Sequence, residues 1–337
     1  MLIHHVDPFC PDMQLIMRAA DFLRKGELVA FPTETVYGLG ANALDEKAVQ
    51  RIFDVKGRPA YNPLIVHLAS LSQVQSLVCW WPPAADRLAE AFWPGPLTLV
   101  LPKNDSVPDI VTAGLKNVAL RVPSHPVAQA LLREVSLPVA APSANRSSHL
   151  SPTTAQHVEK SLGNTVELIL DGGSTPLGIE STVVTLTSSG ARLLRPGALS
   201  VDEIEATLGM KLEHAQTEDN GARLSPGMLE RHYAPEAYLR LFSTHDKAKA
   251  SAWSIEAGNR GERVGALLLT RLEGSIDHPL AMPDDPRAYA RLLYGALHSL
   301  DDLQCGLILA ENPPATSPWQ AVRDRLQRAA HVEAQPG

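Results

Sequence analysis

Residues 28–40 read LVAFPTETVYGLG, and the fold can be worked outward from this stretch. Leu28–Phe31 is a short apolar run that stops at a proline, which is typical of a buried strand. Two threonines then flank Glu34, and Gly38 and Gly40 let the backbone pass close to another group. The polar part is either a threonine-capped turn or a loop that meets a ligand. It is neither a phosphate-binding loop ending in Gly-Lys-Ser/Thr nor a complete dinucleotide fingerprint.

Helix-like and strand-like segments alternate beyond this stretch. Residues 46–55 have helical apolar spacing, and residues 64–68 form another apolar run. Further strands are expected at 97–101, 118–122, 139–141, 166–170 and 182–187, and helices at 83–92, 126–135, 151–162 and 201–208. Ser151 is expected to cap its helix because serine before Pro152 is a start signal. The alternation predicts an α/β fold without a regular repeat.

The composition changes after residue 209. Residues 211–223 are polar and poor in large apolar residues, as in a linker. Residues 225–235 then combine Met, His, Tyr and Arg, which favours a segment lying across a site over a plain surface loop. A second, smaller α/β domain is expected from strands at 238–242, 264–269 and 306–310 and helices at 287–303 and 318–330. We expect domains at 1–209 and 237–337, joined by a linker or lid loop at 210–236.

Composition excludes several classes of protein. The 337 residues include 30 Lys+Arg and 37 Asp+Glu, giving a net charge of −7 that is spread evenly, so no broad basic face for nucleic acid is expected. Cys10, Cys79 and Cys305 lie far apart, which favours a reducing, cytoplasmic location over a disulfide framework. No secretory signal pattern is present, and no apolar run reaches the roughly 18 residues of a membrane span.

Two cations near residue 56 are poorly explained by a purely structural role. Lys56 and Arg58 flank a glycine at a helix end, followed by a proline, Asn62 and the strand ending at His67. A helix C-terminal cap explains one cation but not an arginine held between glycine and proline. A fixed Lys/Arg pair beside an amide suits a polyphosphate. A lone strand histidine such as His67 is more often structural than a ligand-binding group.

Similar polar groups follow other strands. Pro142–Asn145 releases Ser143 and Asn145 after an apolar strand, although Ser/Asn turns are common. Ser181 precedes the strand at 182–187. Arg121 lies inside a strand, where arginines are edge residues or carboxylate clamps, and Arg195 stands before Pro-Gly. Together these motifs predict local positive charge for a small anion.

This set of motifs resembles the Sua5/YrdC/YciO family, and the two-domain arrangement resembles its Sua5 branch. The matching stretches are 32–40, 56–67, 94–98, 121–126, 142–145, 178–183 and 195–197, with 225–228 and 231–235 matching the Sua5 interdomain loop. The resemblance implies a YrdC-like twisted open sheet with a concave, positively charged cavity. It also implies a smaller, Rossmann-like C-terminal α/β domain.

The resemblance implies a nucleotidyltransferase activity. L-threonine, bicarbonate or CO2, and ATP would give threonylcarbamoyl-adenylate, pyrophosphate and water. Separate downstream enzymes would transfer the threonylcarbamoyl group to adenosine 37 of tRNAs that read codons starting with A. Mg2+ is expected with the ATP phosphates, without a dedicated protein metal site. The protein would position reactants and neutralise charge, and would supply no covalent nucleophile. Because a wet carbamate loses CO2 readily, the 225–235 loop is expected to act as a lid.

The resemblance also assigns site residues one by one. The catalytic, phosphate-holding set is Lys56, Arg58, Ser143 and Asn145. Further ATP contacts match Asn62, Ser151 and Arg195, and Tyr233 would approach the nucleotide. The threonine pocket matches Thr35, His67, Arg121, Ser181 and the backbone of Ala141.

Two departures from the family pattern stand beside these matches. Residues 146–150 read RSSHL, where the family usually has Leu-Ser-Gly-Arg-Pro beside the phosphates. Leu229 and Glu230 replace a basic and an aromatic residue in the lid. Two alternatives stay open: an RNA-binding module that uses the concave face, and a carbamoyl- or acyl-adenylate enzyme with another substrate.

Overall fold

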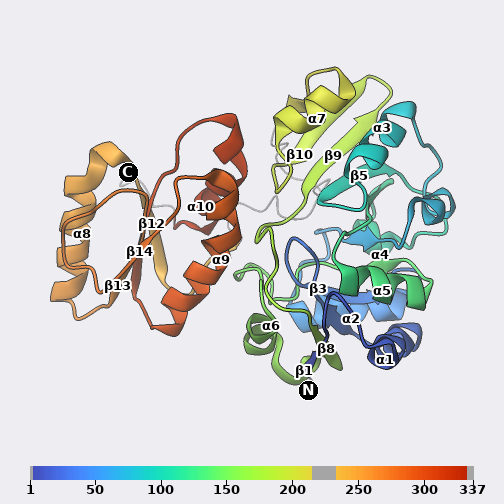
Figure 1. Cartoon of the computed structure of the whole chain (residues 1–337), viewed down its shortest axis with the longest axis horizontal. Helices are drawn as coiled ribbons and strands as arrows, with labels where there is room; N and C mark the ends of the chain where they lie inside the picture. The colour runs from blue at the N-terminus through green and yellow to red at the C-terminus, as the bar shows by residue number, and fades with distance from the viewer. Residues whose placement is uncertain (1–2, 215–232, 332–337) are drawn as a thin grey trace. The chain divides into compact units, whose positions relative to one another are not determined.

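The computed structural model describes residues 3–214 and 233–331, which fall into two compact units (Figure 1). The first unit comprises residues 1–147 and 151–228, and the second comprises 148–150 and 229–337. The expected boundaries at 209 and 236 stay predictions, because residues 215–232 lie outside the described ranges. No helix within the described ranges is long and apolar enough to cross a membrane.

The described strands of the first unit form one large twisted sheet of mixed direction. In spatial order they are β1 (Ile3–His5), β8 (Leu168–Asp171), β2 (Val29–Phe31), β3 (Gly38–Asn42), β7 (Val139–Ala140), β4 (Ile65–His67), β6 (Asn117–Arg121), β5 (Leu97–Pro102), β9 (Thr182–Thr187), β10 (Gly190–Arg195) and β11 (Glu213–His214). Parallel pairs (β4 with β6, β5 with β9) alternate with antiparallel ones (β5 with β6, β9 with β10). This mixture explains the irregular strand spacing in the sequence.

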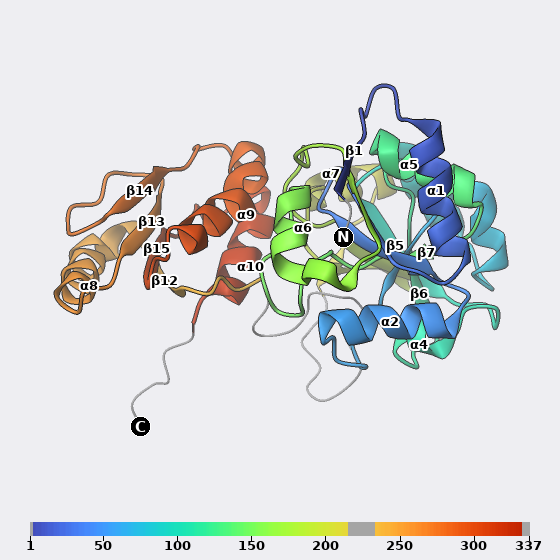
Figure 2. The same cartoon turned by 90° about the horizontal axis from the view of Figure 1, so that it is seen from below.

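Helices cover both faces of the sheet. Successive strand side chains point to opposite faces, and each face has apolar residues to bury. The helices of this unit are α1 (Met13–Arg24), α2 (Glu46–Lys56), α3 (Pro83–Phe92), α4 (Asp109–Thr112), α5 (Pro126–Val135), α6 (Ala155–Leu162) and α7 (Val201–Leu208), with 3-10 turns η1 (Leu71–Ser76) and η2 (Gly163–Thr165). Val29 and Phe31 share a cluster with α1 and α5, which lie side by side (Figure 2). Leu28 and Ala30 share the cluster that contains the apolar face of α2. Because both faces of this strand are buried, the run is apolar at every position, as the sequence predicted for a buried strand.

Two local expectations need correction. Helix α6 begins at Ala155 and is capped by the Thr154 side chain, which accepts from the His157 amide, so Ser151 is not the cap. Residues 38–42 form strand β3 and are not part of a turn. Gly40 is required there because a Cβ would come within 2.8 Å of the Phe31 ring. Other elements also lie outside the expected ranges: β1, β10, β11, α1 and α4, and in the second unit helix α8 (Lys247–Asn259) and strand β14 (His278–Ala281).

The second unit is a doubly wound parallel sheet. Its strands in spatial order are β12 (Tyr238–Phe242), β15 (Leu307–Glu311), β13 (Val264–Leu268) and β14 (His278–Ala281). Its helices are α8 (Lys247–Asn259), α9 (Pro286–Asp302) and α10 (Gln320–Ala329), with 3-10 turns η3 (Thr244–Asp246) and η4 (Ser317–Trp319). Helix α8 covers one face of the sheet, and α9 and α10 cover the other (Figures 1 and 2). The expected smaller Rossmann-like domain is therefore confirmed.

Candidate active site

Strand directions bring four of the predicted site residues to one edge of the large sheet. His67 and Arg121 end the parallel strands β4 and β6, and they face each other in register. Strands β6 and β10 both run antiparallel to their neighbours β5 and β9. As a result Ser181, just before β9, lies at the same edge as Arg195, the last residue of β10. Residues that are far apart in the sequence thus meet at this edge.

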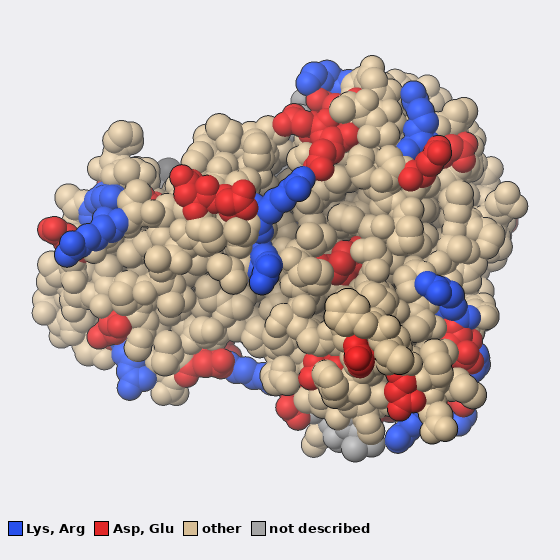
Figure 3. Space-filling model, in the orientation of Figure 1, with Lys and Arg blue, Asp and Glu red and all other residues tan. Residues whose placement is uncertain are grey.

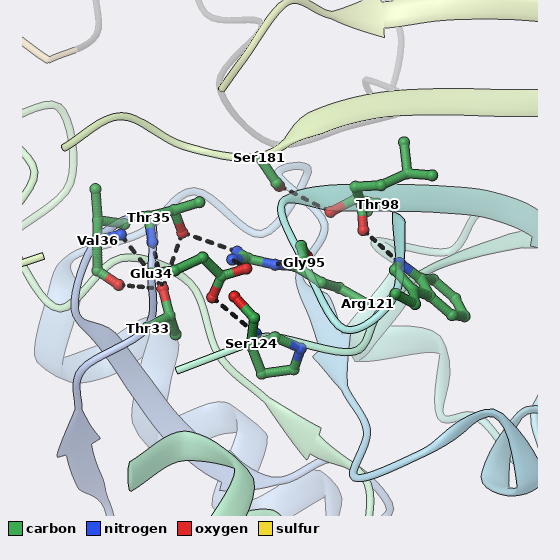
Figure 4. A network of polar contacts seen from close by, with 12 residues as sticks. Thr33, Glu34, Thr35, Val36, Gly95, Thr98, Arg121, Ser124 and Ser181 are labelled. Atoms are coloured by element: carbon green, nitrogen blue, oxygen red, sulfur yellow. Dashed lines mark hydrogen bonds and ion pairs between the residues drawn. The ribbon is translucent and has the colours of Figure 1, made fainter. Parts of the chain in front are cut away.

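Arg121 is held by a network of buried polar groups (Figure 4). Its Nε donates to the Gly95 carbonyl at 3.2 Å, and its Nη1 donates to the Thr35 hydroxyl at 2.9 Å. The Thr35 hydroxyl lies 2.8 Å from that of Thr33, which donates to the Val36 carbonyl at 2.6 Å. This chain of hydrogen bonds fixes the guanidinium plane, as a carboxylate clamp requires.

Glu34 belongs to this network, although the sequence analysis did not assign it to the site. Its Oε1 lies 2.7 Å from Nη2 of Arg121 in an ion pair that is almost wholly buried. Its Oε2 accepts a hydrogen bond from the Ser124 amide at 3.1 Å. The available signal was an acidic residue between two threonines directly after a strand. Its partner lies 87 positions away, so the sequence alone does not reveal the pairing.

Ser181 links the two predicted pockets. Its hydroxyl lies 2.8 Å from the Thr98 hydroxyl, in a pair that the sequence analysis also missed. Nη2 of Arg195 donates to the Ser181 carbonyl at 2.9 Å and to its hydroxyl at 3.2 Å. A predicted ATP contact, Arg195, therefore touches a predicted threonine contact directly.

Lys56 gathers the predicted phosphate-holding residues. It ends α2, where Gly57 adopts a left-handed backbone (φ 59°) that turns the chain. Its ammonium donates to the Ser143 carbonyl at 2.6 Å and also to the Asn145 carbonyl. Burial, reinforced by the charge of Arg58, holds the pKa of Lys56 well below its usual range. An anion bound beside Lys56 would stabilise its charged form and raise this pKa, so the position favours a phosphate.

Arg58 and Asn62 form the adjoining part of this region. Nε of Arg58 donates to the Asn62 carbonyl at 3.0 Å, and Nη2 donates to the Pro63 carbonyl at 2.7 Å. The Asn62 side-chain nitrogen is buried and has no hydrogen-bond partner among the described residues. A buried amide donor without a partner is costly unless a ligand accepts from it, so Asn62 suits a phosphate or nucleotide contact.

Two short segments connect the phosphate-holding residues with the threonine pocket. The first segment follows Thr35, the residue bonded to Arg121. Its Tyr37 carbonyl accepts a hydrogen bond at 2.8 Å from the amide of Ala144, the residue between Ser143 and Asn145. The Ser151 hydroxyl donates to Glu180 at 2.5 Å, directly before Ser181. The residues predicted for the two pockets, apart from Tyr233, are therefore linked within the first unit.

The remaining members of the threonine set lie in the sheet itself. His67 is fully buried, and burial together with the Arg121 charge lowers its pKa to about 3. It is thus a neutral ring at ordinary pH, with Nδ1 3.3 Å from the Ile65 carbonyl. The Ala141 amide donates to the same Ile65 carbonyl at 2.9 Å, so this amide is already engaged within the sheet.

Tyr233 lies within the second unit in this structure. Its backbone is left-handed (φ 62°), and its buried ring lies 5.9 Å from that of Tyr294 and 4.9 Å from the Arg325 guanidinium carbon. Its approach to a nucleotide stays a prediction. Residues 225–232 of the expected lid, including Leu229 and Glu230, lie outside the described ranges.

The positive charge of the site is internal. The four cations Lys56, Arg58, Arg121 and Arg195 are each at most 8% exposed. On the face drawn in Figure 3, Lys and Arg are interspersed with Asp and Glu without a broad basic patch. This distribution suits a small buried anion better than an extended nucleic acid.

Known proteins resemble this chain in both sequence and fold. Residues 21–197 match the Sua5/YciO/YrdC family, described as telomere recombination, and residues 199–331 match the family described as threonylcarbamoyl-AMP synthase, C-terminal domain. Threonylcarbamoyl-AMP synthase of Pyrococcus abyssi is 44% identical over 93% of both chains. That of Bacillus subtilis is 44% identical over 94% of this chain and 92% of its own. The crystal structure of P. abyssi Sua5 complexed with L-threonine has a TM-score of 0.90 at 42% identity, covering 98% of each chain. Escherichia coli YciO has a TM-score of 0.55 at 26% identity, covering 60% of this chain and 98% of its own.

Proposed function

Because the chain belongs to the Sua5/YciO/YrdC family and matches threonylcarbamoyl-AMP synthases over nearly its whole length, we propose that it makes threonylcarbamoyl-adenylate. The substrates are L-threonine, bicarbonate or CO2, and ATP, and the by-products are pyrophosphate and, from bicarbonate, water. The observation that carries this proposal is the buried network around Arg121, in a chain similar to a Sua5 crystallised with L-threonine. We further propose that the product passes to separate tRNA-modifying enzymes in the cytoplasm.

The chemistry assigned to the residues is positioning and charge neutralisation. Arg121 holds the threonine carboxylate, and Thr35 and Ser181 orient its polar groups. The ammonium first gives up a proton to water, and the free amine then attacks CO2 and releases a second proton to give a carbamate. The carbamate oxygen attacks the α-phosphorus of ATP, and pyrophosphate leaves. Lys56 and Arg58 offset the charge of the phosphates, and Mg2+ arrives with ATP as part of that substrate. Because these groups are buried, their electrostatic effect on the reacting atoms is large.

The direct test is incubation of the full-length chain with ATP, bicarbonate and L-threonine, followed by mass detection of the adenylate. The proposal expects product and pyrophosphate only when all three substrates are present. Pyrophosphate release that depends on another amino acid would favour the adenylate-forming alternative. Salt-sensitive RNA binding without ATP consumption would favour the RNA-binding alternative.

The lid expected at residues 225–235 is proposed as a water barrier over the carbamate. It can be tested by ending the chain after His214, because β11 (Glu213–His214) completes the sheet of the first unit by pairing with β10. The proposal expects a folded fragment with little product formation. Turnover equal to that of the full chain would rule out a lid.

A further inference from the structure

Glu34 places a negative charge beside the arginine that holds the threonine carboxylate in the proposed function. The two charged groups lie 2.7 Å apart, and the residues are 4% and 3% exposed. Charges in so dry a site are weakly screened, so a ligand bound to Arg121 interacts strongly with Glu34 as well. The ligands that Arg121 accepts therefore depend on Glu34.

Contacts hold both the Glu34 carboxylate and the backbone that carries it. The Ser124 amide donates to Oε2 at 3.1 Å, and the Leu177 amide donates to the Glu34 backbone oxygen at 2.9 Å. On either side the hydroxyls of Thr33 and Thr35 are bonded to each other at 2.8 Å. Figure 4 shows the carboxylate between the Arg121 guanidinium and Ser124. These anchors keep the negative charge in place when a ligand arrives.

The remaining hydrogens of Arg121 define where a ligand carboxylate fits. A guanidinium has five N–H groups. Gly95 and Thr35 accept from two of them, and Glu34 faces Nη2. Each terminal nitrogen carries two hydrogens, and the contacts within the described residues do not use all of them, so a ligand carboxylate can accept from this guanidinium. A carboxylate there lies about 5 Å from that of Glu34, since both contact one guanidinium.

Building on the proposed function, we propose that Glu34 makes the pocket select the zwitterion of L-threonine and reject a carboxylate that lacks an ammonium group. Glu34 already neutralises Arg121, so a lone anion bound to Arg121 adds a negative charge that this pair does not compensate and that Glu34 repels at short range. The threonine zwitterion brings a positive charge with its carboxylate and leaves the net charge around this pair unchanged. The selection acts when the amino acid enters, before the carbamate forms, and involves no covalent step.

The test compares two ligands in calorimetric titrations of the full-length chain near pH 7. They are L-threonine and (R)-3-hydroxybutyrate, which has the same carboxylate and hydroxyl but hydrogen in place of the ammonium. The wild-type chain is expected to prefer threonine. Glu34→Gln keeps an acceptor for the Ser124 amide and removes the charge. It is expected to lower the threonine preference by on the order of tenfold or more, with (R)-3-hydroxybutyrate bound equally or more tightly.

Glu167→Gln is a matched control in the same unit. Oε1 of Glu167 pairs with Arg51, and Oε2 accepts from the Leu28 amide at 3.0 Å, so its partners also include an arginine and a backbone amide, beside the Glu27 side chain. This variant is expected to leave the ligand preference unchanged. An equal loss of both ligands in Glu34→Gln would indicate a purely structural role and overturn the proposal, as would an unchanged preference.

A second variant covers failure of Glu34→Gln to fold. Glu34→Asp shortens the side chain by one methylene and so moves the negative charge away from Arg121. It is expected to lower the preference for threonine over (R)-3-hydroxybutyrate by about threefold. An unchanged preference in a folded Glu34→Asp chain would overturn the inference. A wild-type chain that binds no threonine would defeat the proposed function as well. A wild-type chain that binds threonine, with its preference intact in the Glu34 variants, would defeat only the role of Glu34.

Discussion

The Lys56 ammonium donates a hydrogen bond to the Ser143 carbonyl at 2.6 Å, joining the end of α2 to the loop after β7. Both residues were predicted to hold ATP phosphates. A buried ammonium that is already bonded to backbone oxygens keeps its position before the nucleotide binds, so little reorganisation is needed. The contact therefore gives a specific expectation for variants of Lys56.

Lys56→Ala is expected to lower the rate of ATP-dependent adenylate formation by about 100-fold or more, because it removes a charge-assisted phosphate contact in a dry site. The thermal unfolding temperature and L-threonine affinity of the variant serve as folding controls. A variant that is folded and fully active would rule out the phosphate role of Lys56.

Arg121→Ala is expected to raise the KM for L-threonine by about 30-fold or more, since bonds to a charged group in a buried site are lost. The KM for ATP should change much less, because the phosphate-holding residues do not depend on the Arg121 guanidinium. Steady-state kinetics with each substrate varied in turn measures both values. Equal increases in the two KM values would argue against a carboxylate clamp.

Much of the α/β pattern could be predicted because local signals agree with it. Helix α3 (Pro83–Phe92) begins at a proline as expected, and β9 (Thr182–Thr187) follows its run of β-branched residues. Strand β3 was missed because glycine has low strand propensity, and Gly40 is needed only because the Phe31 ring packs against it. That contact crosses between strands and leaves no local signal.

The candidate site also contains residues with a local sequence signal and residues without one. The cations and their flanking glycines and prolines could be identified from the sequence, since each motif lies at the end of a strand or helix. The polar partners were less accessible. Ser151 was assigned as a helix cap because Ser-Pro-Thr-Thr offers several cap candidates, and tertiary structure instead directs its hydroxyl to Glu180. Glu34 and Thr98 act through residues more than 80 positions away.

Gly40→Ala is expected to destabilise the first unit by about 1–3 kcal/mol, because the added Cβ meets the Phe31 ring at 2.8 Å in a packed core. Denaturant unfolding monitored by circular dichroism measures the change. Gly295→Ala is the contrasting variant, since Gly295 lies within α9 with no atom near an added Cβ. That change is expected to stabilise the second unit by about 0.5–1 kcal/mol. Equal stability of the wild-type and Gly40→Ala chains would contradict the close packing.

His67 is expected to make the stability of the first unit depend on pH. Its pKa is about 3 in the folded chain, below the ordinary value of 6.5, because burial and Arg121 disfavour the charged ring. The unfolded state therefore binds more protons between these values. The stabilising contribution is complete above pH 6.5 and is lost as the pH falls toward 3, by up to about 1.4 kcal/mol per pH unit.

His67→Gln removes this titration, so the unfolding free energy of the variant should fall less steeply than that of the wild-type chain between pH 6.5 and 4.5. Denaturant unfolding at several pH values in this window measures both slopes. His5→Gln is the control, because His5 is exposed on β1 and its replacement tests a histidine change outside the buried site. Parallel slopes for the wild-type and His67→Gln chains would mean that His67 is solvated or partnered when charged. The neutral ring would then no longer explain how a histidine tolerates a position in register with Arg121.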